Sequence, residues 1–132
     1  MKVLFDTNAW TRLATGDEAV LDVLGDAERI FASVFVLGEL FAGFRGGKLE
    51  RQNRTVLREF LSQPTVQTVF ATVETAEIFG AVKNDLRRAG TPIPLNDVWI
   101  AAHALETGAT LLTFDARFTK VPGVRCWPPV VR

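Results

Sequence analysis

The chain has 132 residues, 48% of them hydrophobic and 23% charged, which is the size and composition of one globular domain. Its 15 basic and 15 acidic side chains cancel, so binding to nucleic acid or to an anionic membrane would need a local patch. The single cysteine, Cys126, excludes an internal disulfide and a zinc site of several thiolates. We expect one domain over residues 1–132 of a soluble, cytoplasmic protein, because no apolar run approaches the roughly 20 residues of a membrane span and Asp6 comes too early for a signal peptide.

Strand and helix patterns alternate from the start of the chain. Residues 3–5 form a short apolar run that ends at Asp6, which predicts a buried strand leading into a helix. Residues 30–32 predict a second strand. Ser33 is expected to cap a helix over residues 34–42, which the following glycines end.

The middle of the chain predicts two further helices with a strand between them. Residues 49–61 carry an apolar helical face made of Leu49, Leu57, Phe60 and Leu61. Residues 66–69 predict a third strand. Thr72 is expected to cap a long helix that ends before Gly90. The apolar face of that helix is predicted to be Val73, Ala76, Phe79, Val82 and Leu86.

In the last third, Asn96 is expected to cap a helix over residues 97–107 that Gly108 closes, and residues 110–113 and 124–126 predict two more strands. Apolar strands that alternate with helices are typical of a parallel sheet covered on both faces. We therefore predict an α/β fold, a three-layer α/β/α sandwich with a short, mostly parallel central sheet. Ligands of such sheets bind at the carboxyl ends of the strands.

Acidic residues stand at that predicted edge. Asp6 directly follows the first strand, and Asp115 follows the strand near residues 110–113. Asp97 lies in a first helical turn, where the helix dipole stabilises an anion, so alone it would be an ordinary first-turn acid. Glu39 has apolar neighbours on its helix, so we expect partial burial and a need for a counter-charge, either Arg45 or a metal ion.

These four acids are more informative together than separately. Carboxylates that converge in one pocket repel one another and raise their own pKa values unless a divalent cation intervenes. Mg2+ and Mn2+ prefer carboxylate and water oxygens, and such ions commonly activate a water toward a phosphate-bearing substrate. The chemistry that this set predicts is phosphodiester hydrolysis.

Four segments carry a resemblance to a known family. They are residues 3–8 (VLFDTN), residues 38–40 (GEL) with Gly43 after them, residues 96–102 (NDVWIAA), and residues 113–115 (TFD) with Phe118 and residues 121–124 (VPGV). In this order they resemble a PIN-domain ribonuclease, and among those a VapC-type toxin of a toxin–antitoxin pair. The resemblance spans almost the whole chain.

The resemblance implies a PIN-like fold and a metal-dependent endoribonuclease. Its catalytic and metal-binding residues would be Asp6, Glu39, Asp97 and Asp115, which would hold one or two Mg2+ or Mn2+ ions. Asn8 and Thr113 match supporting positions that orient the acids. The resemblance also implies an RNA substrate, a homodimer, and a cognate antitoxin whose C-terminal segment blocks the site.

Basic residues recur over one segment and gather on one helical stripe. We call this set the basic stripe: Lys48, Arg51, Arg54 and Arg58. It has two interpretations, a solvated helix face or a surface for RNA phosphates or a partner protein. Salt dependence of RNA binding separates these alternatives, because phosphate contacts release counterions.

Three other residue types are assigned to packing. His103 is about 240° from Asp97 around their helix, so it is expected to pack or face solvent rather than act as a base. Trp10 and Trp99 are expected in core or dimer packing, and Cys126 as a small buried residue.

Three alternatives to a nuclease stay open. A receiver-like Mg2+-binding signalling domain would have an acidic pair after the first strand, where Asp6 is followed by Thr7 and Asn8. A haloacid-dehalogenase-like phosphatase would have a second Asp at position 8. A PIN fold could also serve only as a module that binds RNA or protein.

Overall fold

The computed structural model describes residues 1–129. The elements in chain order are β1 (Lys2–Phe5), α1 (Thr7–Ala14), α2 (Glu18–Asp26), β2 (Arg29–Ser33), α3 (Val34–Phe44), α4 (Glu50–Leu61), β3 (Val66–Val69), α5 (Val73–Arg88), α6 (Leu95–Thr107), β4 (Thr110–Leu112), the 3-10 helix η1 (Ala116–Lys120) and β5 (Cys126–Trp127).

The five strands form one parallel sheet in the order β3-β2-β1-β4-β5. Strand β1 lies in the middle, with Leu4 opposite Phe31 on one side and Leu111 on the other. The chain therefore leaves β1 in one direction to β2 and later returns on the opposite side as β4. Such a reversal opens a crevice at the carboxyl end of the central strand, the end at which Asp6 stands.

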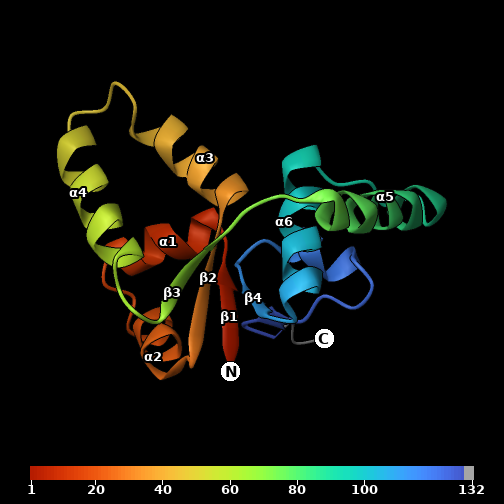
Figure 1. Cartoon of the computed structure of the whole chain (residues 1–132), viewed down its shortest axis with the longest axis horizontal. Coiled ribbons are helices and arrows are strands. Elements are labelled where there is room, and N and C mark those ends of the chain that lie inside the picture. Colours follow the sequence, from red (N-terminus) through yellow and green to blue (C-terminus); the bar gives the residue numbers. More distant parts are fainter. Residues whose placement is uncertain (130–132) are drawn as a thin grey trace.

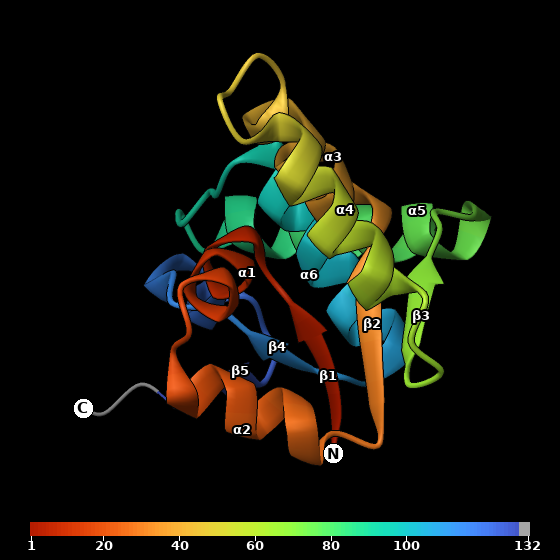
Figure 2. The same cartoon turned by 90° about the vertical axis from the view of Figure 1, so that its left-hand side faces the viewer.

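Helices cover both faces of the sheet. Figure 1 shows α1, α2, α3 and α4 on one side of the strands, with α5 and α6 on the other. The view at 90° shows α2 lying along the sheet near the N-terminus and the α3–α4 pair rising beyond the opposite end (Figure 2). The predicted three-layer α/β/α sandwich is confirmed, and the sheet is parallel throughout the described residues.

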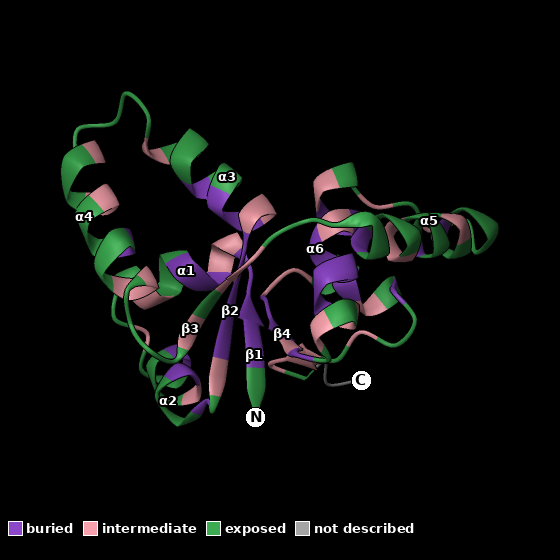
Figure 3. Ribbon diagram, in the orientation of Figure 1, coloured by how far each residue is buried: buried purple, intermediate pink, exposed green. Residues whose placement is uncertain are grey.

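The core is built on the central strands and on the helix faces turned toward them (Figure 3). Val3, Leu4 and Leu111 have no exposed surface. Phe5 packs edge-on against Phe60 of α4 at 5.6 Å between ring centroids. Because both faces of the sheet are covered, these strands are apolar on both sides rather than alternating.

Most predicted elements are confirmed, but two helix assignments were wrong in detail. Asn96 does not cap α6: the helix begins at Leu95 after Pro94, and the Asn96 side chain donates a hydrogen bond to the Phe35 carbonyl at 3.4 Å. In α5 the predicted face is only partly buried, because Val73 is 77% exposed. The buried face of α5 is made of Thr75, Val82 and Leu86, with Ala76 exposed.

Other boundaries differ by a few residues. Leu49 precedes α4 and is 57% exposed, so it does not belong to the buried face with Leu57. Strand β4 ends at Leu112 and β5 covers Cys126 and Trp127. Helix α2 was not predicted, although Asp17 caps it and Val20 and Leu24 form its buried face.

In the described part of the chain, no helix is both long enough and apolar enough to cross a bilayer.

Candidate active site

Asp6 occupies the centre of the site because β1 ends there and α1 begins. It is 5% exposed. Its Oδ1 accepts a hydrogen bond from the backbone N–H of Thr7 at 2.8 Å, and its Oδ2 accepts one from the Thr113 hydroxyl at 2.9 Å. Burial raises the pKa of Asp6 above its usual value, and these two hydrogen bonds partly offset the effect.

Asp97 is the most strongly perturbed acid of the site. It lies in the first turn of α6 and is 9% exposed. Burial, and then repulsion from Asp6, raises the pKa of Asp97 to about 6. Arg117 opposes the rise, whereas Asp115 and Glu39 add to it. Four acids from four separate segments therefore lie close enough to repel one another.

Asp115 differs from the two buried aspartates because a cation holds it. It caps η1, with Oδ1 accepting the Arg117 backbone N–H at 3.0 Å. The Arg117 guanidinium donates to both carboxylate oxygens, the shortest contact being Nη2 to Oδ2 at 2.6 Å. Hydrogen bonds from Arg117 hold the pKa of Asp115 below its usual value.

Glu39 reaches the site from α3. Its Oε1 accepts a hydrogen bond from the Thr7 hydroxyl at 2.9 Å, next to Asp6 in the chain. The prediction that Glu39 is partly buried was wrong: the helix presents this position to solvent. The described residues contain no ion pair between Glu39 and Arg45. The hydroxyl of Thr7 provides the contact that the sequence analysis expected from a cation.

Asn8 and Thr113 connect the ends of β1 and β4. Asn8 accepts a hydrogen bond from the Phe114 backbone N–H at 3.1 Å, and its amide nitrogen lies 3.5 Å from Thr113 Oγ1. The Thr113 hydroxyl also accepts the Asp115 backbone N–H at 3.1 Å while donating to Asp6. The segment that carries Asp115 is thereby fixed beside Asp6.

Arg117 lies against two of the candidate acids, although the sequence did not predict it there. Its Nη2 lies 2.6 Å from Asp115 and 3.6 Å from Asp97. The relevant feature of the sequence is that Arg117 comes two residues after Asp115, the acid that follows β4. The short helix η1 that begins between them brings the Arg117 side chain back to Asp115. That spacing alone could not show that Arg117 also reaches Asp97, because Asp97 comes from a different element.

A divalent cation fits the donor chemistry of this edge. The carboxylates repel one another, and one guanidinium, partly exposed, is the single basic side chain paired with them among residues 1–129. In the described conformation, no three acids are gathered tightly enough to hold one ion. Glu39 accepts a hydrogen bond from Thr7, and Asp115 accepts hydrogen bonds from Arg117.

Of the residues assigned to packing, the histidine and both tryptophans pack as predicted, whereas Cys126 is half-buried rather than buried. His103 is fully buried, with Nδ1 at 2.7 Å from the Ser33 hydroxyl and Nε2 at 3.1 Å from the Phe70 carbonyl. Because a carbonyl only accepts, Nε2 carries the hydrogen and Nδ1 accepts from Ser33. Trp10 is buried, and Trp99 stacks on Phe79 with 4.0 Å between ring centroids.

The basic stripe lies apart from the acids. Arg51 and Arg58 are exposed on α4, whereas Arg54 pairs with Glu50 at 2.9 Å and lies over the Phe41 ring. Within the described residues, the stripe makes no ion pair with the four acids.

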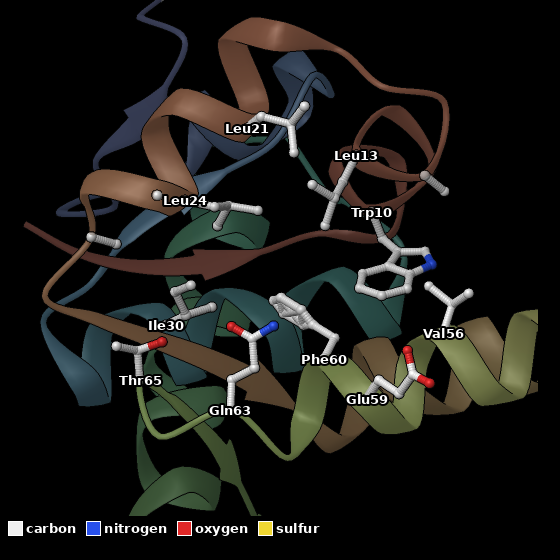
Figure 4. Close-up of a pocket in the computed structure, with 13 residues that line it drawn as sticks. Trp10, Leu13, Leu21, Leu24, Ile30, Val56, Glu59, Phe60, Gln63 and Thr65 are labelled. Atoms are coloured by element: carbon white, nitrogen blue, oxygen red, sulfur yellow. The ribbon is translucent and has the colours of Figure 1, made fainter.

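A separate groove runs between α1, α2 and α4, with a volume of about 560 Å³. Glu59, Gln63 and Thr65 contribute polar side chains to its lining, and its apolar lining includes Trp10, Leu13, Leu21, Val56 and Phe60. Figure 4 shows their side chains converging from the three helices. Leu21 and Val56 are each 45% exposed at its rim. The groove contains none of the four acids.

The fold is a doubly wound parallel α/β sheet with acids clustered at the carboxyl ends of its strands, the edge at which such sheets bind their ligands. A model of the PIN-domain family matches residues 3–124. The chain therefore belongs to the PIN-domain family, and the resemblance seen in the sequence is confirmed.

Its similar proteins are VapC ribonucleases. The protein named Ribonuclease VapC2 from Rickettsia felis is 30% identical over 105 residues, 79% of this chain and 77% of that protein. The tRNA(fMet)-specific endonuclease VapC of Salmonella typhimurium is 29% identical over 76% of this chain and 75% of that protein.

Solved structures agree with the sequence matches. VapBC2 from Rickettsia felis, solved bound to a DNA fragment from its promoter, aligns with a TM-score of 0.83 and 27% identity, covering 96% of this chain and 97% of that one. DNA-bound VapBC from Salmonella typhimurium aligns with a TM-score of 0.84 and 26% identity, covering 96% of both chains. Both are toxin–antitoxin complexes.

Proposed function

We propose that this chain is an endoribonuclease that requires Mg2+ or Mn2+ and is the toxin of a toxin–antitoxin pair. The observation that carries the metal requirement is Asp97, a buried acid whose pKa is raised to about 6 beside other carboxylates. Carboxylates that repel one another in a buried cluster are typical of functional sites. A divalent cation bound among them would offset the repulsion. The relatives named as ribonucleases support RNA as the substrate.

The four acids have distinct parts in this proposal. Asp6 and Asp97 are buried, Asp6 raises the pKa of Asp97, and within residues 1–129 neither carboxylate is held by a two-pronged guanidinium contact, so we assign these two as the primary ligands. Asp115 and Glu39 complete the ligand set after leaving Arg117 and Thr7. When bound, one or two ions supply the positive charge that acidifies water and stabilises charge developing on the phosphate.

Thr113 and Asn8 are supporting residues. The Thr113 hydroxyl fixes one oxygen of Asp6, and the Thr7 backbone N–H fixes the other. Asn8 holds the backbone beside Asp115. These bonds fix the direction of the remaining lone pairs of Asp6, as a preorganised ligand requires.

The experiment is RNA cleavage by the purified, metal-stripped protein with and without Mg2+ or Mn2+. We expect cleavage only with the ion and its loss in excess EDTA. The Asp6→Asn variant, purified in parallel, controls for contaminating nuclease. Cleavage undiminished in EDTA would contradict the metal requirement. Rapid phosphorylation by a small phosphodonor without cleavage would favour the receiver-like alternative.

We further propose that an antitoxin occupies the groove between α1, α2 and α4. The similar solved structures are VapBC complexes, which supports such a partner. The groove exposes Leu21 and Val56, and covering them would remove apolar surface from water. An amphipathic segment with apolar anchors fits a groove of this kind.

A homodimer and a cytoplasmic setting are also part of the proposal. Apolar side chains are exposed at and just before the start of α5, where Phe70 is 66% and Val73 is 77% exposed. A second copy that covers these side chains would bury them. Analytical sedimentation of the parent and of Val73→Glu tests this. We expect the parent to sediment as a dimer and Val73→Glu as a monomer. Equal sedimentation coefficients for the two proteins would contradict the proposed dimer interface.

The basic stripe is proposed as a contact for RNA phosphates. Arg51 and Arg58 are exposed and two helical turns apart on α4, so both can reach a backbone that follows the helix. Arg54 contributes less, because Glu50 neutralises it.

A further inference from the structure

Arg117 touches two of the acids that the proposed function assigns to metal binding. Its guanidinium donates from Nε and Nη2 to Asp115, which covers both oxygens of that carboxylate. The same Nη2 lies 3.6 Å from Oδ2 of Asp97. The side chain therefore bridges an acid from α6 and an acid that follows β4.

The contact engages both oxygens of the Asp115 carboxylate and places a positive charge beside it. Because a guanidinium and a divalent cation repel each other, an ion that binds the same carboxylate competes with Arg117 for its negative charge.

The guanidinium can leave without disturbing the core. The Arg117 side chain is 56% exposed, and it is attached to η1, a short surface turn. The pair is thus held by charge and hydrogen bonds at the protein surface, where water and salt can compete.

We propose that Arg117 is an internal counter-cation that holds Asp115 and Asp97 in the metal-free protein and competes directly with the divalent ion for them. This inference rests on the proposed metal-binding function of the site. Arg117 is a positioning residue: it sets the metal concentration at which the site fills, and it leaves the acids when the ion arrives.

The test is Mn2+ binding to metal-stripped protein, measured by titration calorimetry without RNA. Arg117→Gln should lower the dissociation constant for Mn2+ by roughly two- to fivefold, the range expected of a partly exposed ion pair. Arg117→Lys keeps the positive charge but cannot make the bidentate contact with Asp115, so its dissociation constant for Mn2+ should lie between those of the parent and Arg117→Gln. Lys120→Gln, on the same short helix and exposed, is the matched control and should bind like the parent.

Salt separates competition from a merely structural role. Because added salt screens the Arg117 pairs, the difference between the parent and Arg117→Gln should shrink as ionic strength rises. In EDTA, Arg117→Gln should melt at a lower temperature than the parent, because the acids lose their counter-charge. Addition of Mn2+ should raise the melting temperature of Arg117→Gln by more than that of the parent.

The outcomes are distinguishable. A parent that binds Mn2+ and cleaves RNA, with Arg117→Gln binding Mn2+ equally well or more weakly, would overturn this inference and leave the proposed function standing. A parent that neither binds Mn2+ nor cleaves RNA would overturn both.

Discussion

The hydroxyl of Thr113 lies 2.9 Å from Oδ2 of Asp6 and donates a hydrogen bond to it, although 107 positions separate the two residues. Strands β1 and β4 are neighbours in the sheet, so their carboxyl ends bring this pair together. The same hydroxyl accepts the backbone N–H of Asp115. One side chain therefore aligns two of the acids.

Thr113→Val should reduce RNA cleavage roughly tenfold or more, because removing a hydrogen bond to a charged group costs about 1.5–3 kcal/mol. The isosteric variant keeps the volume of the side chain but leaves Asp6 and the Asp115 N–H without this partner. The measurement is the cleavage rate at saturating Mg2+. Thr113→Ser retains the hydroxyl and should stay near the parent rate; equal losses in both variants would contradict the assigned role.

Asp6→Asn and Asp97→Asn should each abolish cleavage and relieve any growth arrest on expression. Neither should destabilise the metal-free protein, since each removes charge from a repulsive cluster. Thermal melting in EDTA should give the same or a higher midpoint than the parent. Full activity in both variants would place the active site elsewhere, whereas a large drop in melting temperature would make the acids structural.

Asp97 should make the stability of the metal-free protein depend on pH. Its pKa is about 6 when folded, against the usual 3.8, so the unfolded chain loses this proton first as pH rises. The stabilisation from Asp97 is complete below pH 3.8 and is lost as pH rises through about 6, a change of roughly 1–3 kcal/mol.

Urea unfolding at pH 5 and pH 7 in EDTA measures this effect. The parent should lose more unfolding free energy than Asp97→Asn between the two values. Asp22→Asn, which removes an exposed charge on α2, is the control and should follow the parent. Identical pH profiles for the parent and Asp97→Asn would show that Asp97 does not carry the effect.

The basic stripe can be tested by salt dependence. Arg51→Ala combined with Arg58→Ala should weaken RNA binding and flatten its log–log salt slope by about 0.7 for each lost phosphate contact. Binding is measured in the Asp6→Asn background, and cleavage at saturating RNA should stay near the parent rate. Lys83→Ala combined with Arg88→Ala removes the same charge from α5 and should leave the slope unchanged. Equal slopes in all proteins would make the stripe an ordinary solvated helix face.

The groove can be tested separately from the acids. Leu21→Glu and Val56→Glu place charge at its rim, so each should weaken binding of the antitoxin at least tenfold while RNA cleavage persists. The partner for this measurement is the product of a small reading frame next to the gene, co-expressed with this chain. Glu77→Lys, a charge change on the exposed face of α5, serves as the control for a site outside the groove. Undiminished binding by both groove variants would place the antitoxin on another surface.

The sequence by itself predicted the order of the strands and of every α-helix except α2, and it singled out the four acids as candidates. Residues 3–5 are apolar without alternation because both faces of β1 are covered. Asp6 follows that strand, and its side chain caps α1. Ser33 caps α3 as predicted, and Gly108 closes α6 with a φ of 71°. These are local effects, readable from a few neighbouring residues.

Only the tertiary structure decided what each acid touches. Glu39 has apolar neighbours in sequence, yet its place on α3 leaves it exposed and bonded to Thr7. Asn96 is a residue type that commonly caps a helix, but α6 begins at Leu95 after Pro94, and the Asn96 side chain donates to the Phe35 carbonyl instead. Arg117 meets Asp97 because η1 and α6 converge at the sheet edge, a contact between distant segments that local sequence patterns do not encode.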